Sequence, residues 1–227
     1  MTMLTEESRA ANPATGSASS SSRCASPQRG PDTVASMERR EDWFPRAVVL
    51  VEGVSDQLAL EALARRRGRE LGAEGVAIVP IGGSKNIGRF LDLFGPRGAD
   101  VVLAGLCDAA EVGDYRDALH RAGLGSNLGI ADMERLGFFV CDVDLEDELV
   151  RAAGPAVVEG VFEALGDLGS FRTFQRQPAW RGRPHAEQLR RFAGTRSGRK
   201  IQTGAMLVDA VDLARMPRPL DLVLTHV

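Results

Sequence analysis

Acidic residues follow three apolar stretches of this sequence, and this placement is typical of a divalent-metal site. Glu52 comes directly after the apolar run 47–51, and Asp108 comes directly after Cys107. A third group lies at 142–148, where five of seven residues are acidic. If the apolar runs are neighbouring parallel strands, their carboxyl ends bring the carboxylates together at one edge of a sheet. The pattern therefore predicts a site for Mg²⁺, a hard ion that prefers oxygen ligands.

The spacing of the individual acids suggests which of them share an ion. Glu52 ends a strand and Asp56 lies one helical turn later, so both can face one ion that Asp108 approaches from the next strand. Asp144 and Glu146 are the preferred ligands of a second ion. Two ions about 4 Å apart suit in-line phosphodiester cleavage, because one activates the attacking water and the other stabilises the leaving oxygen.

Each acidic group also has an ordinary structural explanation. Glu52 can be a polar residue that leaves a strand, Asp56 can favour the positive end of a helix, and 142–148 can be a solvated helix start. Asp108 can be a simple strand-end acid. The combination favours a metal site, because acids crowded at one edge repel one another unless cations or protons balance them.

Strands and helices that alternate from residue 46 onward would position these acids. Strands are predicted at 47–51, 76–81, 100–107 and 138–141, and helices at 55–67, 85–94, 115–122 and from residue 145. Strands that alternate with helices form a mostly parallel sheet covered on both faces. We therefore expect an α/β, Rossmann-like fold with a central four-stranded sheet flanked by helices.

Composition divides the chain into three parts. Residues 1–42 are rich in Ser, Ala, Thr and Pro, which predicts a disordered tail, and Met37 is as suitable a start as Met1. Residues 43–153 hold the predicted sheet. Residues 154–227 are interpreted as a helical extension that completes the domain beside the sheet. With 227 residues and 44% hydrophobic content, the chain can bury one main core.

Net charge and cysteine usage set limits on the class of protein. A formal charge of −3 predicts no broad attraction to nucleic acid, so a polyanion would be held by a local basic patch or by metal ions. No apolar stretch reaches the roughly 18 residues of a membrane span, and no secretory signal is evident. Three cysteines, an odd number, fit a reducing compartment. We expect a soluble, cytoplasmic protein without a membrane partner.

Basic residues suggest two further contacts with phosphate. Gly83, Ser84 and Lys85 stand at a predicted helix N-terminus, where backbone N–H groups can hold a phosphate; a plain turn with a solvated lysine is an equal alternative. An arginine-rich stretch with aromatic residues between the arginines can grip a backbone and stack on bases, or it can be a solvated surface over buried aromatics. Its members are Arg172, Arg176, Arg181, Arg183, Arg190 and Arg191 with Phe171, Phe174 and Trp180.

The order of these features resembles the Toprim domain, and more closely the Toprim nuclease domain of the OLD (overcoming lysogenisation defect) family. The resemblance extends over residues 46–227 and is carried by Glu52-Gly53, by 82–86, by Asp108, by 144–146 and by Lys200 ahead of a last helical pattern. It implies Mg²⁺- or Mn²⁺-dependent hydrolysis of nucleic-acid backbones, with DNA favoured over RNA, and a role such as phage defence.

The resemblance also implies roles for individual residues. Glu52, Asp56 and Asp108 match one metal site, with Glu52 also counted as catalytic, and Asp144 and Glu146 match the other. Lys200 matches a catalytic lysine that stabilises the pentavalent phosphate. The chain is thus expected to be a metal-dependent endonuclease that uses two ions.

Two departures from the family pattern matter. The Toprim motif Asp-x-Asp reads Asp108-Ala109-Ala110 here, and Glu111 is a weak substitute because a helix-initiating residue is expected to point elsewhere. OLD proteins also carry an ABC-type ATPase, whereas no Gly-x-x-x-x-Gly-Lys-[Ser/Thr] motif occurs in this sequence. We therefore expect any ATPase to be a separate partner, and we leave a homodimer open.

Two alternatives remain at this stage. A degenerate, non-catalytic Toprim module that binds nucleic acid or an ATPase partner is motivated by Ala110. Primase or topoisomerase chemistry on the same fold is less favoured, because the single tyrosine, Tyr115, lies on a predicted internal helix.

Overall fold

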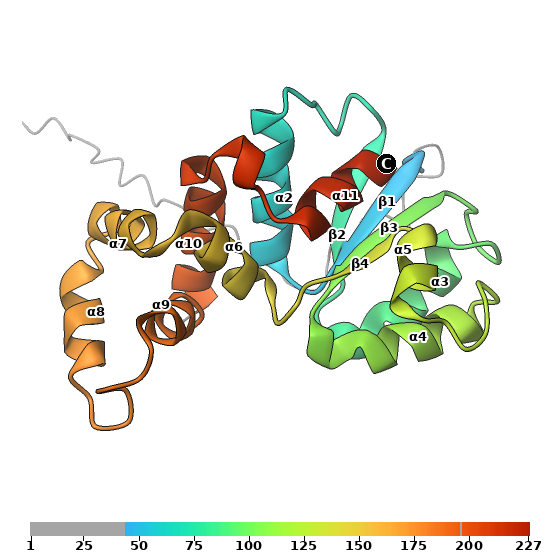
Figure 1. Ribbon diagram of the computed structural model, residues 1–227. Helices are drawn as coiled ribbons and strands as arrows, with labels where there is room; N and C mark the ends of the chain where they lie inside the picture. The colour runs from blue at the N-terminus through green and yellow to red at the C-terminus, as the bar shows by residue number, and fades with distance from the viewer. Residues whose placement is uncertain (1–43, 196) are drawn as a thin grey trace, which may run out of the picture. The chain divides into compact units, whose positions relative to one another are not determined.

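Four parallel strands form the centre of the computed structural model, which describes residues 44–195 and 197–227 (Figure 1). The strands are β1 (Ala47–Val51), β2 (Val76–Pro80), β3 (Val102–Cys107) and β4 (Phe138–Val140), in the order β2-β1-β3-β4. The predicted α/β sheet is therefore confirmed. The disordered tail predicted for residues 1–42 lies outside the described residues, and the boundary proposed at residue 153 stays a prediction.

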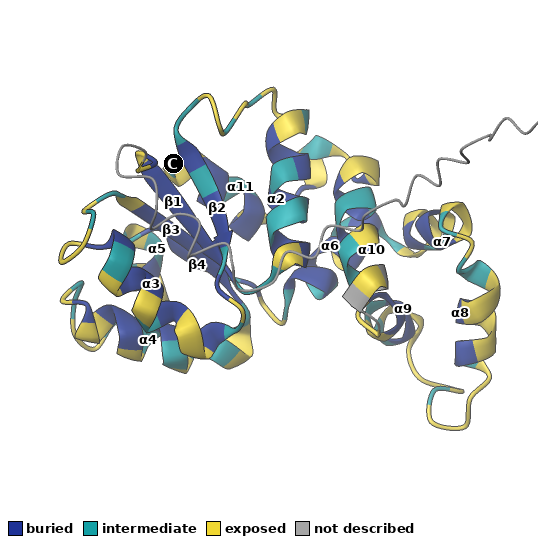
Figure 2. Cartoon of the chain, turned by 180° about the vertical axis from the view of Figure 1, so that it is seen from behind, coloured by how far each residue is buried: buried dark blue, intermediate teal, exposed yellow. Residues whose placement is uncertain are grey.

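The central strand β1 is buried on both faces, as Figure 2 shows for much of the sheet. Its side chains are all apolar, because a parallel strand covered by helices on both sides has no solvent-facing positions. Beside it, Gly105 of β3 is fixed by space: an added Cβ would lie 2.6 Å from the Phe138 ring and 3.2 Å from the Leu50 carbonyl oxygen. Glycine at this position lets β1, β3 and β4 approach closely.

Helices cover both faces of the sheet (Figure 1). The longer helices are α2 (Val54–Arg66), α3 (Ile87–Phe94), α4 (Val112–Arg121), α6 (Leu145–Ala153), α7 (Pro155–Ala164), α8 (Leu168–Gln175), α9 (His185–Ala193), α10 (Ser197–Ala210) and α11 (Arg218–His226), with the short α5 (Ile130–Arg135). Three 3-10 turns are η1 (Ser84–Asn86), η2 (Ala109–Glu111) and η3 (Leu213–Arg215). Helices α2 and α11 lie on one face and α3 and α4 on the other. Within the described residues, no helix is long and apolar enough to cross a membrane.

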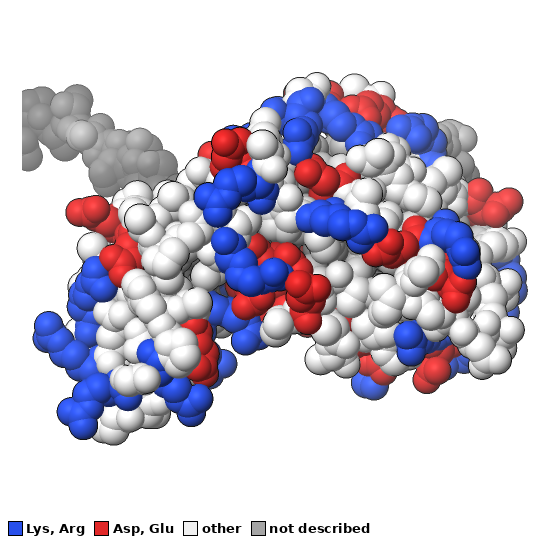
Figure 3. Space-filling model, in the orientation of Figure 1, with Lys and Arg blue, Asp and Glu red and all other residues white. Residues whose placement is uncertain are grey.

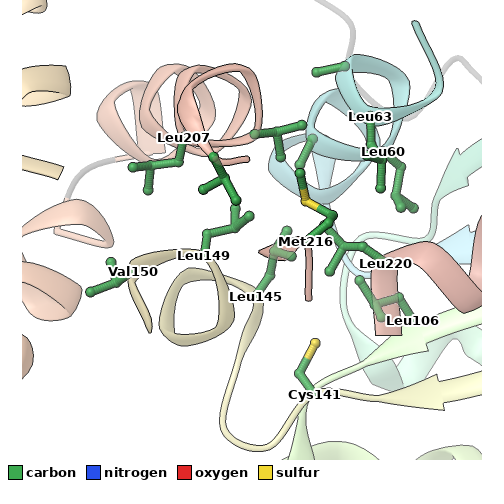
Figure 4. Packing of buried hydrophobic residues seen from close by; sticks show 14 of the residues in the cluster. Leu60, Leu63, Leu106, Cys141, Leu145, Leu149, Val150, Leu207, Met216 and Leu220 are labelled. Carbon is green, nitrogen blue, oxygen red and sulfur yellow. The ribbon is translucent and has the colours of Figure 1, made fainter. Parts of the chain in front are cut away.

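The C-terminal helices return to the sheet. Helix α10 packs along α2, and α11 packs on β3 and β4, although both follow residue 196 in the sequence. The Arg66 guanidinium at the end of α2 donates to the carbonyl oxygens of Val208 (2.5 Å) and Val211 (2.6 Å) near the end of α10. Figure 4 shows the shared core, in which Leu60 of α2, Leu207 of α10 and Leu220 of α11 are all buried.

A cluster of aromatic rings holds α7, α8 and α9 together. The ring of Phe162 lies 5.2 Å from that of Phe171 and 5.0 Å from that of Phe192, measured between centroids, and Phe174 stands 5.5 Å from Phe192. Phe171 and Phe174 are buried, so the hypothesis that they stack on bases is wrong. Trp180 is half-buried at the border of this cluster, 4.8 Å from Phe174.

Candidate functional site

Glu52 lies at the carboxyl end of β1, where it also organises the neighbouring loop. Its carbonyl oxygen accepts hydrogen bonds from the N–H groups of Gly82 (3.0 Å) and Gly83 (3.2 Å), which follow β2. Both glycines have positive φ angles, 73° and 106°, a region that side chains disfavour. The loop after β2 is thereby held beside the first predicted metal ligand.

Asp56 lies in the first turn of α2 and is almost fully buried. Its Oδ2 accepts the N–H of Gly53 at 2.9 Å and its Oδ1 accepts the Ser55 hydroxyl at 3.3 Å. Burial raises the pKa of this carboxyl, while the hydrogen bond from Gly53 and the charge of Lys200 act in the opposite direction. Asp56 therefore caps the N-terminus of α2, and the positive charge of Lys200 acts on its carboxylate.

Asp108 follows β3 and is the most strongly perturbed acid of the predicted metal ligands. Burial, followed by the charges of Asp56, Asp144 and Glu52, raises the pKa of Asp108 to about 8. An acid with this pKa is mostly protonated at neutral pH in the absence of a cation. The structure thus brings Asp108 together with the acids predicted from the other strands.

Glu111 also belongs to this edge, contrary to the expectation that it points elsewhere. Burial, and then the nearby charge of Glu52, raises the pKa of its carboxyl. Its Oε2 atom is buried without a hydrogen-bond partner among the described residues. The 3-10 turn η2 explains the difference, because it separates Asp108 from α4 and redirects the side chain that follows Ala110. The only sign of this in the sequence is an acid directly after the motif.

Asp144 is the N-cap of α6 and is paired with an arginine. Its Oδ1 accepts the N–H of Asp147 at 2.8 Å, and the Arg190 Nε lies 3.2 Å from Oδ1 and 3.1 Å from Oδ2. The Nη2 of Arg190 donates a further bond to Oδ2. Burial raises the pKa of Asp144, but the bonds from Arg190 and Asp147 outweigh it, and the pKa is lowered. Arg190 was predicted only as one member of the arginine-rich stretch.

Glu146 and Lys200 form the second pair on this side. The Lys200 Nζ lies 3.4 Å from Oε2 of Glu146, whose side chain is 9% exposed. Burial raises the pKa of Glu146 to about 7, and the charges of Asp56 and Asp144 add to this while Lys200 opposes it. Burial works against the charged form of Lys200, but the surrounding carboxylates prevail and raise the lysine pKa. The predicted catalytic lysine therefore lies beside a predicted metal ligand.

The loop predicted to hold phosphate has most of its polar groups engaged. Gly83 uses its N–H for the Glu52 carbonyl, the Ser84 hydroxyl donates to Asp114 at 2.9 Å, and the Lys85 Nζ lies 2.6 Å from the same carboxylate. The Lys85 side chain is 85% exposed. Its role in phosphate binding stays a prediction.

Exposed arginines border the acidic edge on the side of the extension. Figure 3 shows acidic side chains gathered near the middle of this face, with basic side chains directly beside them. Arg172 pairs with Glu159 and Arg183 with Glu187. Among the described residues, no ion pair involves the three exposed arginines Arg176, Arg181 and Arg191.

A cavity of about 240 Å³ lies where α6, α9 and α10 meet. Asp144 and Glu146 line it together with Lys200, Arg190, Arg191 and Trp180. The cavity thus places two predicted metal ligands, the predicted catalytic lysine and a partly exposed aromatic ring around one space. Sequence reasoning had not connected Trp180 with the acidic edge.

The acidic edge fits a divalent cation in its charge and chemistry. Carboxylate oxygens dominate it, and one of them, Glu111 Oε2, is buried without a hydrogen-bond partner among the described residues. Burial, together with the charges of the surrounding acids, raises the pKa of Asp108 to about 8. These are the properties of a site that a hard cation would balance. Across 44–195 and 197–227, no three His, Cys, Asp or Glu side chains already form a converged ligand cluster.

Comparison with known proteins identifies the domain. Residues 43–108 match the family model for the TOPRIM domain of overcoming lysogenization defect protein-like sequences. A search of curated proteins found no match.

Solved structures extend the likeness over most of the chain. The C-terminal region of the Xanthomonas campestris pv. campestris OLD protein is similar with a TM-score of 0.61 and 24% identity, covering 81% of this chain and 95% of that one. The C-terminal region of the Burkholderia pseudomallei OLD protein has a TM-score of 0.59 and 20% identity, with coverage of 81% and 97%. At these identities the structures establish the fold. The chain thus has the fold of the OLD C-terminal regions, and residues 43–108 match the OLD-like TOPRIM domain.

Proposed function

We propose that the chain is a Mg²⁺- or Mn²⁺-dependent endonuclease that hydrolyses DNA phosphodiester bonds with two metal ions. The observation that carries this proposal is the acidic edge, where burial, followed by the charges of Asp56, Asp144 and Glu52, raises the pKa of Asp108 to about 8. Acids with strongly shifted pKa values gather at functional sites more often than elsewhere. The Toprim family match, which implies a nuclease-type family, supports the same conclusion.

The acids divide into two groups of ligands. Glu52, Asp56 and Asp108 would hold one ion, and Glu111 is a further ligand in place of the missing second aspartate. Asp144 and Glu146 from α6 would hold the other. When bound, the ions lower the pKa of the attacking water and offset negative charge on the leaving oxygen.

Lys200 supplies positive charge to the phosphate. Its Nζ is held next to Glu146, and its side chain is 31% exposed, so the ammonium group can reach a substrate in the adjoining cavity. Charge that is already in place when the pentavalent phosphate forms stabilises it without reorganisation. We assign Lys200 to this role and Lys85 to a peripheral contact with the backbone.

Nicking of a supercoiled plasmid tests the proposal. The wild-type protein should nick the plasmid in Mg²⁺ or Mn²⁺ and not in a chelator. Glu52→Ala and Asp108→Ala should each lower the nicking rate by about 100-fold or more, because residues that bind the metal directly matter at least as much as the residues that support them. Asp117→Ala is a matched control on the exposed face of α4. Nicking that is unchanged in both ligand variants would contradict the assigned site.

A second candidate is a non-catalytic Toprim module that binds nucleic acid or a separate ABC-type ATPase. Ala110 favours it, because this residue stands where the Toprim motif has its second aspartate. Calorimetric titration separates the two candidates: the nuclease should bind Mn²⁺, whereas the absence of binding at millimolar metal supports the module.

A further inference from the structure

The two acids of α6 are each paired with a cation from the helical extension. Arg190 of α9 contacts both carboxylate oxygens of Asp144, and Lys200 of α10 lies 3.4 Å from Glu146. Asp144 also accepts the N–H of Asp147 through Oδ1. Both of its oxygens are therefore engaged by donors, so a metal ion that binds Asp144 must compete with the Arg190 guanidinium.

Arg190 lies between two side chains that anchor α9 in the core. Its neighbours Leu189 and Phe192 are 0% and 3% exposed and anchor the helix in the core, where Phe192 packs against Phe162. The Arg190 side chain itself is 36% exposed. A guanidinium in this position has room to leave its partner without unpacking the helix.

The cavity beside Arg190 is where the released side chain would contact a ligand. Its wall carries Asp144, Glu146 and Glu187 as acids, and Arg190, Arg191 and Lys200 as bases, so the formal charges balance. A divalent ion on Asp144 and Glu146 would leave the wall with a net positive charge. Arginine then suits a phosphodiester, because its planar group binds two phosphate oxygens at once.

We propose that this cavity is a phosphodiester-binding site that the Asp144–Arg190 pair closes, and that a metal ion at Asp144 and Glu146 opens it by releasing Arg190 to the phosphate. The inference rests on the proposed function, because it requires an ion at these two acids. It makes Arg190 both a competitor of the metal and a contact of the nucleic acid.

Calorimetric titration with Mn²⁺ tests the competition. Arg190→Gln removes the charge at similar length and should tighten Mn²⁺ binding by about three- to tenfold, because a charge-assisted bond no longer opposes the ion. Arg176→Gln, an exposed control outside the cavity lining with no ion pair among the described residues, should change it by less than about twofold. A purely structural arginine predicts a lower melting temperature for Arg190→Gln and no gain in metal affinity.

Fluorescence anisotropy with a labelled DNA duplex tests the release. In Ca²⁺, which also takes oxygen ligands, Arg190→Gln should bind the duplex about tenfold more weakly than the wild type, opposite in sign to its effect on Mn²⁺. In a chelator, Asp144→Asn should bind the duplex several-fold more tightly than the wild type, because its Arg190 is already free.

The outcomes separate this inference from the proposed function. If the wild type binds no Mn²⁺, both are overturned. If the wild type binds and nicks but Arg190→Gln gains no metal affinity, or Asp144→Asn gains no DNA affinity in a chelator, the release of Arg190 is overturned and the nuclease stands.

Discussion

The two halves of the acidic edge differ in what balances their charge. On the side of β1 and β3, burial raises the pKa of Asp108 and of Glu111, and the charges of other acids add to it: Asp56, Asp144 and Glu52 at Asp108, and Glu52 at Glu111. On the side of α6, Asp144 and Glu146 face Arg190 and Lys200. Within 44–195 and 197–227, no ion pair neutralises Glu52, Asp108 or Glu111, whereas Asp144 and Glu146 each have a cationic partner.

This difference shows what the helical extension contributes. The sheet alone positions acids at the ends of its strands, but the cations come from α9 and α10, which lie far along the chain. The extension therefore sets the charge of the site as well as covering the core. We expect variants on the two sides to respond differently, and the following predictions run from the largest effect to the smallest.

Lys200→Ala should reduce plasmid nicking by about 100-fold or more, because loss of a group that stabilises transition-state charge has an effect of this size. Lys85→Ala is the matched control, since Lys85 is the other lysine of the chain and is 85% exposed. It should reduce nicking a few-fold at most. An equal loss in both variants would mean that the lysines act only through general attraction to DNA.

The buried acids beside β1 and β3 should make the metal-free protein less stable as pH rises. The pKa of Asp108 goes from 3.8 when unfolded to about 8 when folded. Between these values the folded state binds more protons, so the free energy of unfolding falls from about pH 4 to about pH 8. Asp108→Asn should match the wild type near pH 4 and exceed it by about 2 kcal/mol at pH 8, after allowance for solvent screening.

Urea unfolding in a chelator measures this effect, with Asp117→Asn as an exposed control that should follow the wild type at both pH values. A difference between Asp108→Asn and the wild type that is the same at pH 4 and pH 8 would show that ionisation of Asp108 is not the cause. Mn²⁺ should remove the advantage of the variant, because the ion stabilises the ionised wild type.

Glu111→Ala should weaken Mn²⁺ binding by about tenfold if this acid replaces the second aspartate of the motif. Its Oε2 is buried without a partner among the described residues, which is the state expected of an unused ligand atom. Adding Ala110→Asp to Glu111→Ala should recover part of the affinity in calorimetry. No change in Glu111→Ala would leave the site with Glu52, Asp56 and Asp108 only.

Gly83→Ala should lower the free energy of unfolding by about 1 kcal/mol, because φ at this residue is 106°, where a side chain is strained. Gly72→Ala is the control, since an added Cβ there meets nothing within 4 Å and the backbone does not have a positive φ. Thermal unfolding followed by circular dichroism compares the two. Equal stability of both variants would show that the loop after β2 adapts freely.

Much of the sheet half was predictable from local patterns. The continuous apolar run of β1 indicated a buried parallel strand, and parallel strands place their carboxyl ends at one edge, so Glu52 and Asp108 were expected together. Glu111 was predicted to point away because its neighbours suggested a helix start; the turn η2 that redirects it has no clear signature in the sequence.

The extension was predictable only in outline. A helical pattern around 201–211 was visible, and it forms part of α10. Phe171, Phe174 and Trp180 fitted two interpretations, stacking on bases or burial under a solvated surface, because the same aromatic residue types serve both. In the structure the Phe171 ring packs against Phe162 and the Phe174 ring packs against Phe192, so both rings belong to the core.

The sequence by itself determined the class of the fold and the acids at its edge, because strand periodicity and strand ends are local properties. Tertiary structure alone decided which cation faces which acid. Arg190 and Asp144 are separated by 46 residues, and their pairing depends on how α9 packs, through long-range burial of Leu189 and Phe192. Electrostatic partners follow from such packing, since charge acts through space and the sequence does not specify distances.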